Sequence, residues 1–169
     1  MDWSRLFDSD LDNIYHFAMI VPDFDRALRA VGAQLGVQAW AEPQDGMNSV
    51  RLPDGRVSTV RLRATYSRQG PPFVELIEGV ADPHSVFTIA GGPRLHHVGV
   101  HVADWRAAVE RMQARGMTLE GVMLRAGPDP EPMGIAFMRN AFGLRIEVVD
   151  VSRRTWLRGW LAPAPPAGP

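Results

Sequence analysis

The sequence predicts an α+β fold made of two tandem βαβββ modules, and three observations support this prediction. HFAMIVPDFDRAL at 16–28 aligns without gaps with HVGVHVADWRAAV at 97–109, which indicates an internal repeat. In each copy, apolar and polar residues first alternate, as in a half-buried strand, and apolar residues then recur at helical spacing. Three further strand-like stretches follow each helix, so both halves share one order of elements.

Both predicted helices carry start and stop signals. Asp23 and Asp104 directly precede the helical spacing, where a carboxylate can accept from the first backbone N–H groups. Gly36 and Gly116 are expected to end the two helices. The buried stripes are predicted to contain Leu28, Val31 and Leu35 in the first helix, and Trp105, Ala108, Val109 and Met112 in the second.

The remaining strands are expected between segments rich in turn residues. LPDG and SRQGPP separate those of the first half, and AGPDPEP and NAFG separate those of the second. The predicted strands are 37–42, 57–66 and 73–78, then 121–125, 134–139 and 144–151.

The repeat also predicts the domain organisation. The first module is expected at 14–80, a linker at 81–94, the second module at 95–151, and a C-terminal extension at 152–169 that ends in a disordered Pro/Ala tail. Trp156, Leu157, Trp160 and Leu161 fall at helical spacing in this extension, which predicts a helix docked on the body of the protein or on a partner.

Composition excludes several classes of function. The chain has 169 residues, 46% of them apolar and 22% charged, with a formal net charge of −1. This balance argues against binding to nucleic acid or to a membrane surface. Cysteine is absent, and every basic residue is arginine, which excludes thiolate nucleophiles and Schiff-base lysines. The N-terminus lacks the pattern of a signal peptide, and we expect a cytoplasmic protein.

Strand alternation places polar residues of both halves on one side of the sheet. His97 and His101 share a face opposite the valines of their strand, and His16 lies opposite Phe17, Met19 and Val21. Glu75 and Glu147 likewise lie opposite the apolar residues of the closing strands. If the apolar faces pack on the helices, two imidazoles and two carboxylates face one concavity, and a divalent ion would compensate the buried carboxylates.

A third strand carries candidate ligand-binding residues. Arg61, Arg63 and Thr65 alternate with Val60, Leu62 and Ala64. The arginines are predicted either to face the cleft and hold a carboxylate or phosphate, or to form an exposed, ion-paired face.

The segments YHFAMIVPDFDRAL…FVELIEG and LHHVGVHVADWRAAV…LRIEVVD resemble the vicinal-oxygen-chelate superfamily over residues 14–151. This superfamily includes glyoxalase I, methylmalonyl-CoA epimerase, extradiol dioxygenases and bleomycin-resistance proteins. The amino-acid sequences of both segments most resemble the epimerase-like branch. The resemblance implies curled mixed sheets around a central metal-binding cleft. It places the metal ligands at His16, Glu75, His97 and Glu147, with His96 on the opposite side of its strand.

The resemblance also implies a reaction. One divalent ion (Ni, Co, Zn, Mn or Mg) would stabilise an enolate while a carboxylate removes the proton next to a carbonyl. Glu147 is the first candidate base and Glu75 the second, and His101 would be a proton shuttle, a substrate contact or a polar lining residue. The second base of epimerases follows the first helix, where Glu42 and Asp45 are the nearby acids.

These features favour a metal-dependent isomerase, epimerase or lyase acting on a small carbonyl compound. Two alternatives are a non-catalytic binding protein of the resistance type and a natural-product cyclase or isomerase on the same scaffold. Members of the family dimerise in several ways, and we expect a homodimer.

Overall fold

The computed structural model describes residues 13–127 and 129–162, which form eight strands and three α-helices. The elements of the first half are β1 (Ile14–Val21), α1 (Phe24–Leu35), β2 (Gln44–Arg51), β3 (Val57–Tyr66) and β4 (Phe73–Glu78). Those of the second half are β5 (Arg94–Val102), α2 (Trp105–Ala114), β6 (Thr118–Leu124), β7 (Pro132–Arg139) and β8 (Arg145–Asp150). A short 3₁₀ turn, Val151–Arg153, leads into α3 (Arg154–Leu161).

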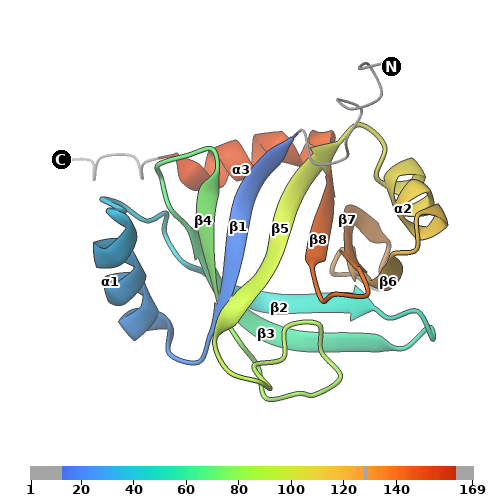
Figure 1. Cartoon of the computed structure of the whole chain (residues 1–169), viewed down its shortest axis with the longest axis horizontal. Helices are drawn as coiled ribbons and strands as arrows, with labels where there is room; N and C mark the ends of the chain where they lie inside the picture. Colours follow the sequence, from blue (N-terminus) through green and yellow to red (C-terminus); the bar gives the residue numbers. More distant parts are fainter. Residues whose placement is uncertain (1–12, 128, 163–169) are drawn as a thin grey trace.

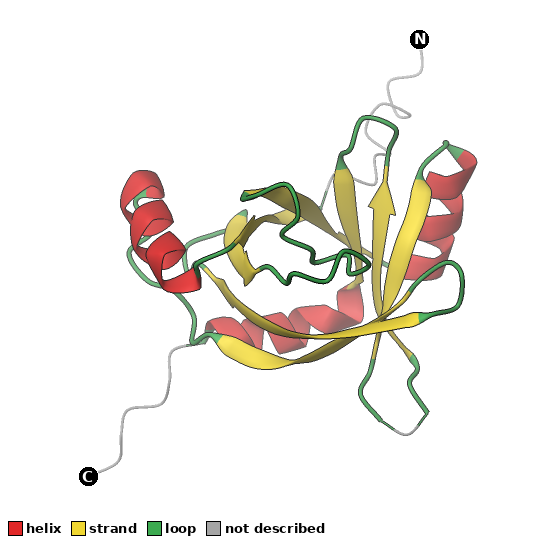
Figure 2. Ribbon diagram, turned by 90° about the horizontal axis from the view of Figure 1, so that it is seen from below, coloured by secondary structure: helices red, strands yellow, loops and turns green. Residues whose placement is uncertain are grey.

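The strands form one mixed sheet that closes on itself in the order β1-β4-β3-β2-β6-β7-β8-β5. β1 pairs with β4 and β5 with β8 in parallel, whereas the other neighbours are antiparallel. Figure 1 shows β1 and β5 side by side at the centre, with α1 and α2 on opposite sides of the molecule. Figure 2 shows the curl of the sheet and α3 running alongside it. The predicted α+β class is confirmed.

The predicted helix boundaries are confirmed. The Asp23 carboxylate accepts from the backbone N–H of Arg26, and Gly36 ends α1 in the left-handed conformation with φ of 68°. Asp104 caps α2 in the same way. The prediction that Leu35 is buried is wrong, because this residue is 60% exposed on the last turn of α1.

The second strand of the first half lies later than predicted. Residues 37–42 form an irregular connection with one bridge at Trp40, and the strand is β2. QDGMN reads as turn sequence, but eight consecutive pairs with β3 and three with β6 hold it extended. Pairing with neighbouring strands outweighs local propensity here.

Two register shifts in the β1–β5 pair change which side chains point inward. Ile14 pairs with Val100 and His16 with Gly99, so β1 carries an extra residue at Tyr15. Ala18 pairs with His97 and Met19 with Leu95, so β5 carries an extra residue at His96. A bulge of this kind redirects a side chain that simple alternation would place on the other face.

The apolar faces of the strands pack on the helices as alternation predicts. Val98, Val100 and Val102 of β5 form one cluster with the buried residues of α2. Met19 and Val21 of β1 lie in a second cluster with α1. The opposite faces of the strands therefore line the interior of the curled sheet.

The predicted C-terminal helix is α3, and it docks on the body of the protein. Leu157 is buried against Tyr15 and Tyr66, and the Trp160 indole N–H donates to the carbonyl of Glu42 at 2.7 Å. The predicted disordered tail falls almost entirely at 163–169, outside the described residues. Within the described part of the chain, no helix is both long and apolar enough to cross a membrane.

Candidate metal centre

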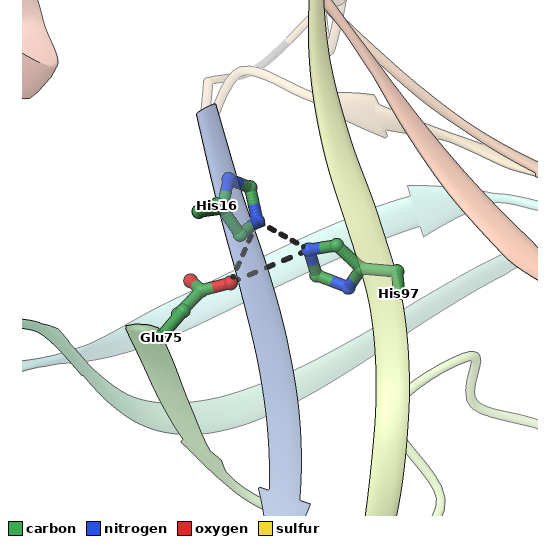
Figure 3. Close-up of side chains that lie close together, drawn as sticks. All are labelled: His16, Glu75 and His97. Atoms are coloured by element: carbon green, nitrogen blue, oxygen red, sulfur yellow. Dashed lines mark hydrogen bonds and ion pairs between the residues drawn. The ribbon is translucent and has the colours of Figure 1, made fainter. Parts of the chain in front are cut away.

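Four buried side chains from four strands meet in the interior of the curled sheet. His16 comes from β1, Glu75 from β4, His97 from β5 and Glu147 from β8. The four are at most 7% exposed. Figure 3 shows His16, Glu75 and His97 pointing toward one another from neighbouring strands. The structure thus brings together the four residues that the sequence singled out.

Their donor atoms lie within one small volume. The Nε2 atoms of His16 and His97 are 2.7 Å apart, and Glu75 Oε2 lies 3.3 Å from both. Glu147 Oε2 lies 3.5 Å from His16 Nε2 and 3.6 Å from His97 Nε2. The donor atoms of His16, Glu75 and His97 all lie within 4.8 Å of one another, and Glu147 approaches the two imidazoles from outside this group.

This donor set fits a divalent cation. Metal bonds to imidazole nitrogen and carboxylate oxygen are about 2.0–2.2 Å long, so ligands of one ion lie roughly 3.0–3.5 Å apart. The Glu75 Oε2 atom is buried and accepts no well-oriented hydrogen bond, and His16 Nδ1 also has no partner. Buried polar atoms without partners are rare in native proteins, and a bound ion is one explanation for such an atom.

The charges of the site are strongly coupled. Burial opposes ionisation of Glu75, but the imidazoles of His16 and His97, each 3.3 Å away, hold the pKa of its carboxyl well below the usual range. Burial also opposes protonation of His97, yet the carboxylates of Glu147 and Glu75 raise its pKa to about 9. Two carboxylates in this interior therefore attract a positive charge, whether from a proton or from a metal ion.

His96 lies inside the sheet, which corrects the prediction that it faces the other way. The β5 bulge turns it inward, where its Nδ1 is 2.8 Å from His97 Nδ1 and its Nε2 is 2.7 Å from the carbonyl of Val86. The ring is 3% exposed and stacks on Phe87. Burial, then the neighbouring charges of His97 and Arg145, lowers the pKa of His96 well below its ordinary value.

These contacts determine which nitrogen of His97 can bind a metal. A carbonyl only accepts, so the Val86 contact requires a proton on His96 Nε2. In neutral His96 the Nδ1 atom then accepts from His97 Nδ1–H, which leaves a lone pair on His97 Nε2. Hydrogen bonds of this type orient metal-binding histidines in other proteins.

Arg145 competes for the same nitrogen of His96. Its guanidinium lies 2.6 Å from His96 Nε2 and 3.2 Å from the Val86 carbonyl, and it is also bound to Glu120. A bond from Arg145 to His96 would require the opposite tautomer, with the proton of His97 on Nε2. Only the tautomer with His96 donating to Val86 leaves His97 able to bind a metal ion.

The two tyrosines of the chain were not predicted as site residues, and both contact the carboxylates. The Tyr15 hydroxyl donates to Glu147 Oε2 at 3.3 Å. Burial, then the charge and hydrogen bonding of Glu75, raises the pKa of Tyr66 well above its ordinary value. Alternation places Tyr15 on the outer face, and only the β1 bulge turns it inward. Tyr66 lies on the same inner face of β3 as Leu62 and Ala64. A prediction that placed this face toward the cavity would therefore have included Tyr66.

His101 lines the same interior, on the face that the sequence predicted. Its ring stacks on Tyr15 with centroids 3.8 Å apart. Burial, then the positive charges of Arg154 and His16, lowers the pKa of His101 to about 4. A neutral imidazole therefore stands beside the tyrosine that binds Glu147.

A cavity of about 280 Å³ opens directly onto this cluster. Glu75, His97 and Glu147 form part of its polar wall, together with Tyr15 and Tyr66. Much of the remaining wall is apolar, with Leu62, Ile77, Met123, Met133 and Ile135 among its residues. The site can thus receive a small organic molecule next to the four donor atoms.

Arg61 and Arg63 do not face this cavity, which corrects their proposed role in the cleft. Arg61 pairs with Asp45 at 2.7 Å on the outer surface, and Arg63 pairs with Asp25 at 3.0 Å. Leu62 and Ala64 line the cavity instead. The alternative, an exposed ion-paired face, is correct for both arginines.

The two acids proposed as a second base lie in different places. Asp45 lines the cavity but is engaged by Arg61, whose hydrogen bonds lower the pKa of the carboxyl. Glu42 is absent from the cavity lining and offers its backbone carbonyl to Trp160. His84 is exposed on the surface.

The family model of the Glyoxalase/Bleomycin resistance protein/Dioxygenase superfamily matches residues 15–137. The chain belongs to this superfamily. The predicted resemblance is thereby confirmed. No curated protein sequence matches the chain.

Several solved structures share the fold. Methylmalonyl-CoA epimerase from Mycobacterium tuberculosis is 20% identical with a TM-score of 0.53, and the alignment covers 89% of this chain and 95% of the epimerase. A variant of the Streptomyces coelicolor methylmalonyl-CoA epimerase in complex with 2-nitronate-propionyl-CoA is 20% identical with a TM-score of 0.52, covering 82% and 93%. At these identities the similarity establishes the fold.

Gly99 provides a direct test of the site geometry. It lies opposite His16, and a Cβ added there would be 1.9 Å from the His16 ring. We expect Gly99→Ala to displace His16 and to reduce bound metal to well below half of the wild-type content, as measured by mass spectrometry. Gly159→Ala on α3 is the control, because nothing lies within 4 Å of its added Cβ. Unchanged metal content in Gly99→Ala would contradict the assignment of His16 as a ligand.

His96 provides a second test, with affinity as the readout. We expect His96→Phe to retain the buried ring but to weaken metal affinity about 10- to 100-fold, because His97 loses the partner that selects its tautomer. Competition with a coloured chelator measures the change, and the exposed His84→Phe serves as the control. Equal affinities for His96→Phe and the wild type would show that His96 does not position His97.

Proposed function

We propose that this protein is a metal-dependent isomerase or epimerase that moves a proton on the carbon next to a carbonyl group. The observation that carries the proposal is a cluster of four buried donor side chains, three of which form part of the wall of a small cavity. His16, Glu75, His97 and Glu147 would hold one divalent ion. When bound, such an ion polarises a substrate carbonyl and favours the enolate.

The chain itself supplies the base. Glu147 lies beside the cavity, and its carboxylate would remove the carbon-bound proton while the electron pair moves to the carbonyl oxygen. Return of the proton to the same carbon, from either face, would give exchange or inversion. Glu75 is the second candidate, because it lines the same wall. No oxidant or reductant is required.

Neighbouring aromatic groups would hold the base in position. Tyr15 donates a hydrogen bond of 3.3 Å to Glu147 and so orients its carboxylate at the cavity wall. His101 stacks on Tyr15 and would hold its ring against the site. With a pKa of about 4, His101 stays neutral near pH 7 and would not act as an acid.

The organisation of the chain fits this proposal. The order strand, helix and three strands occurs twice, and each half contributes one histidine and one glutamate to the cluster. We assign residues 14–80 and 95–151 to two modules joined by 81–94. Cytoplasmic location and homodimerisation remain predictions from the sequence.

Exchange with solvent deuterium tests the reaction. The metal-loaded protein is incubated in D₂O with methylmalonyl-CoA, which the named structural neighbours suggest, and with compact keto acids. We expect one substrate to gain deuterium at the carbon next to its carbonyl, as detected by mass spectrometry. Glu147→Gln should slow this exchange by about 10²- to 10⁴-fold, the usual contribution of a general base.

Two controls isolate the effect of the base. Metal content is measured in Glu147→Gln, because its amide oxygen can still bind an ion, and exchange rates are compared at equal loading. Glu110→Gln, which changes an exposed carboxylate on α2, should exchange at the wild-type rate. Substrate exchange that persists unchanged in Glu147→Gln would rule out Glu147 as the base. Saturable binding without exchange of any substrate would favour a binding protein instead.

A further inference from the structure

Arg153 lines the cavity, and no acidic side chain among the described residues pairs with it. It precedes α3, and within the described residues its guanidinium makes no ion pair and no hydrogen bond to a side chain. Its Nε atom is buried without any hydrogen-bond partner. The guanidinium lies over the Trp156 ring, with Cζ 5.1 Å from the centroid.

This environment differs from that of other arginines in the fold. Arg61 pairs with Asp45, Arg63 with Asp25, and Arg145 with Glu120. Arg153 instead has Arg125 as a charged neighbour, and burial lowers the pKa of its guanidinium. A partly buried cation without an anion is unfavourable, and an anionic ligand would relieve the cost.

No other arginine lies among the described residues that line the cavity. Among the described residues of its lining, Arg153 is the only arginine, whereas Asp45, Glu75 and Glu147 are acidic. Asp45 is engaged by Arg61, and the two glutamates belong to the proposed metal centre. The proposed ion would offset the charge of the two glutamates, whereas the charge of Arg153 has no such counter-ion among the described lining residues, so Arg153 would attract an anionic group of a ligand. A single guanidinium matches one carboxylate in charge and in bidentate geometry.

The rest of the lining selects a compact, apolar body. Near Arg153, α3 contributes Trp156, Leu157 and Trp160 to the cavity, and the opposing strands contribute Met123 and Met133. Aromatic and methionine side chains suit flat or flexible apolar groups. The volume of about 280 Å³ suits a ligand of one ring or a short chain.

α3 holds Arg153 in place. Leu157 is buried in a cluster with Tyr15 and Tyr66, and Trp160 is bonded to Glu42. The Leu161 carbonyl accepts from Arg68. Because α3 is anchored through these contacts, the position of Arg153 relative to the four donor atoms is defined.

From these observations we infer that Arg153 binds the carboxylate of a compact, largely apolar carbonyl compound. The role of the carbonyl rests on the proposed function, whereas the role of the carboxylate rests on Arg153 and the cavity. The ligand would span the site, with its carbonyl at the four donor atoms and its carboxylate at the start of α3.

A matched pair of probes tests this inference. 4-Oxo-4-phenylbutanoate and its primary amide have the same shape and differ in charge. Binding of each is measured by calorimetry with the protein as purified and after removal of metal. We expect the acid to bind the wild type about tenfold or more tightly than the amide, in both forms. Arg153→Gln should remove this preference and Arg153→Lys should retain part of it, while Arg158→Gln, on the exposed side of α3, should leave it unchanged.

The outcomes separate the two proposals. Equal binding of acid and amide to the wild type, no binding of either, or a preference that persists in Arg153→Gln would each overturn the inference. A preference that depends on metal rather than on Arg153 would place the carboxylate at the four donor atoms and would also overturn it. If the preference depends on Arg153 but no carbonyl compound exchanges deuterium, the ligand class stands and the proposed reaction fails.

Discussion

The arrangement of the interior depends on the electrostatics of two buried carboxylates beside two buried imidazoles. Carboxylates removed from water are unfavourable unless a positive charge compensates them. Here Glu75 and Glu147 lie within 3.6 Å of the nitrogens of His16 and His97, and only a proton or a metal ion can balance the cluster. Each of the four side chains comes from a different strand, so the sheet must curl to bring them together.

The central pair of strands is shaped to build the site. β1 and β5 lie side by side, and each carries one bulge. The β1 bulge turns Tyr15 toward Glu147, and the β5 bulge turns His96 toward His97. Gly99 leaves room for the ring of His16 between the bulges. Two irregularities in register thus supply hydrogen-bond partners for one glutamate and one histidine of the cluster.

Much of the fold and of the donor set could be predicted from the sequence. The repeat, the capping aspartates and the period-two alternation gave the order of elements, and alternation correctly placed His16, Glu75, His97 and Glu147 on the inner face. These patterns are local in the sequence or repeat at a fixed offset, so they can be recognised without knowledge of the tertiary structure. The predicted position of β2 was wrong, because a polar, glycine-containing strand is specified by the strands it pairs with rather than by its own β-propensity.

The missed features share a different cause. Tyr15 and His96 face inward only because of bulges, and a bulge depends on the register between two strands rather than on either strand alone. The facing of β3 was equally open, since arginines or small apolar residues could have lined the cleft. Arg153 could not be recognised as unpaired, because its environment exists only once α3 has docked.

On the proposal made above, the four buried donors bind one divalent ion. Mass spectrometry of untagged protein, purified without chelators, measures this most directly, with His97→Ala as the control. We expect about one divalent ion per chain in the wild type and none in the control. A protein that contains no metal and takes up no stoichiometric Ni, Co, Zn, Mn or Mg on dialysis would contradict it.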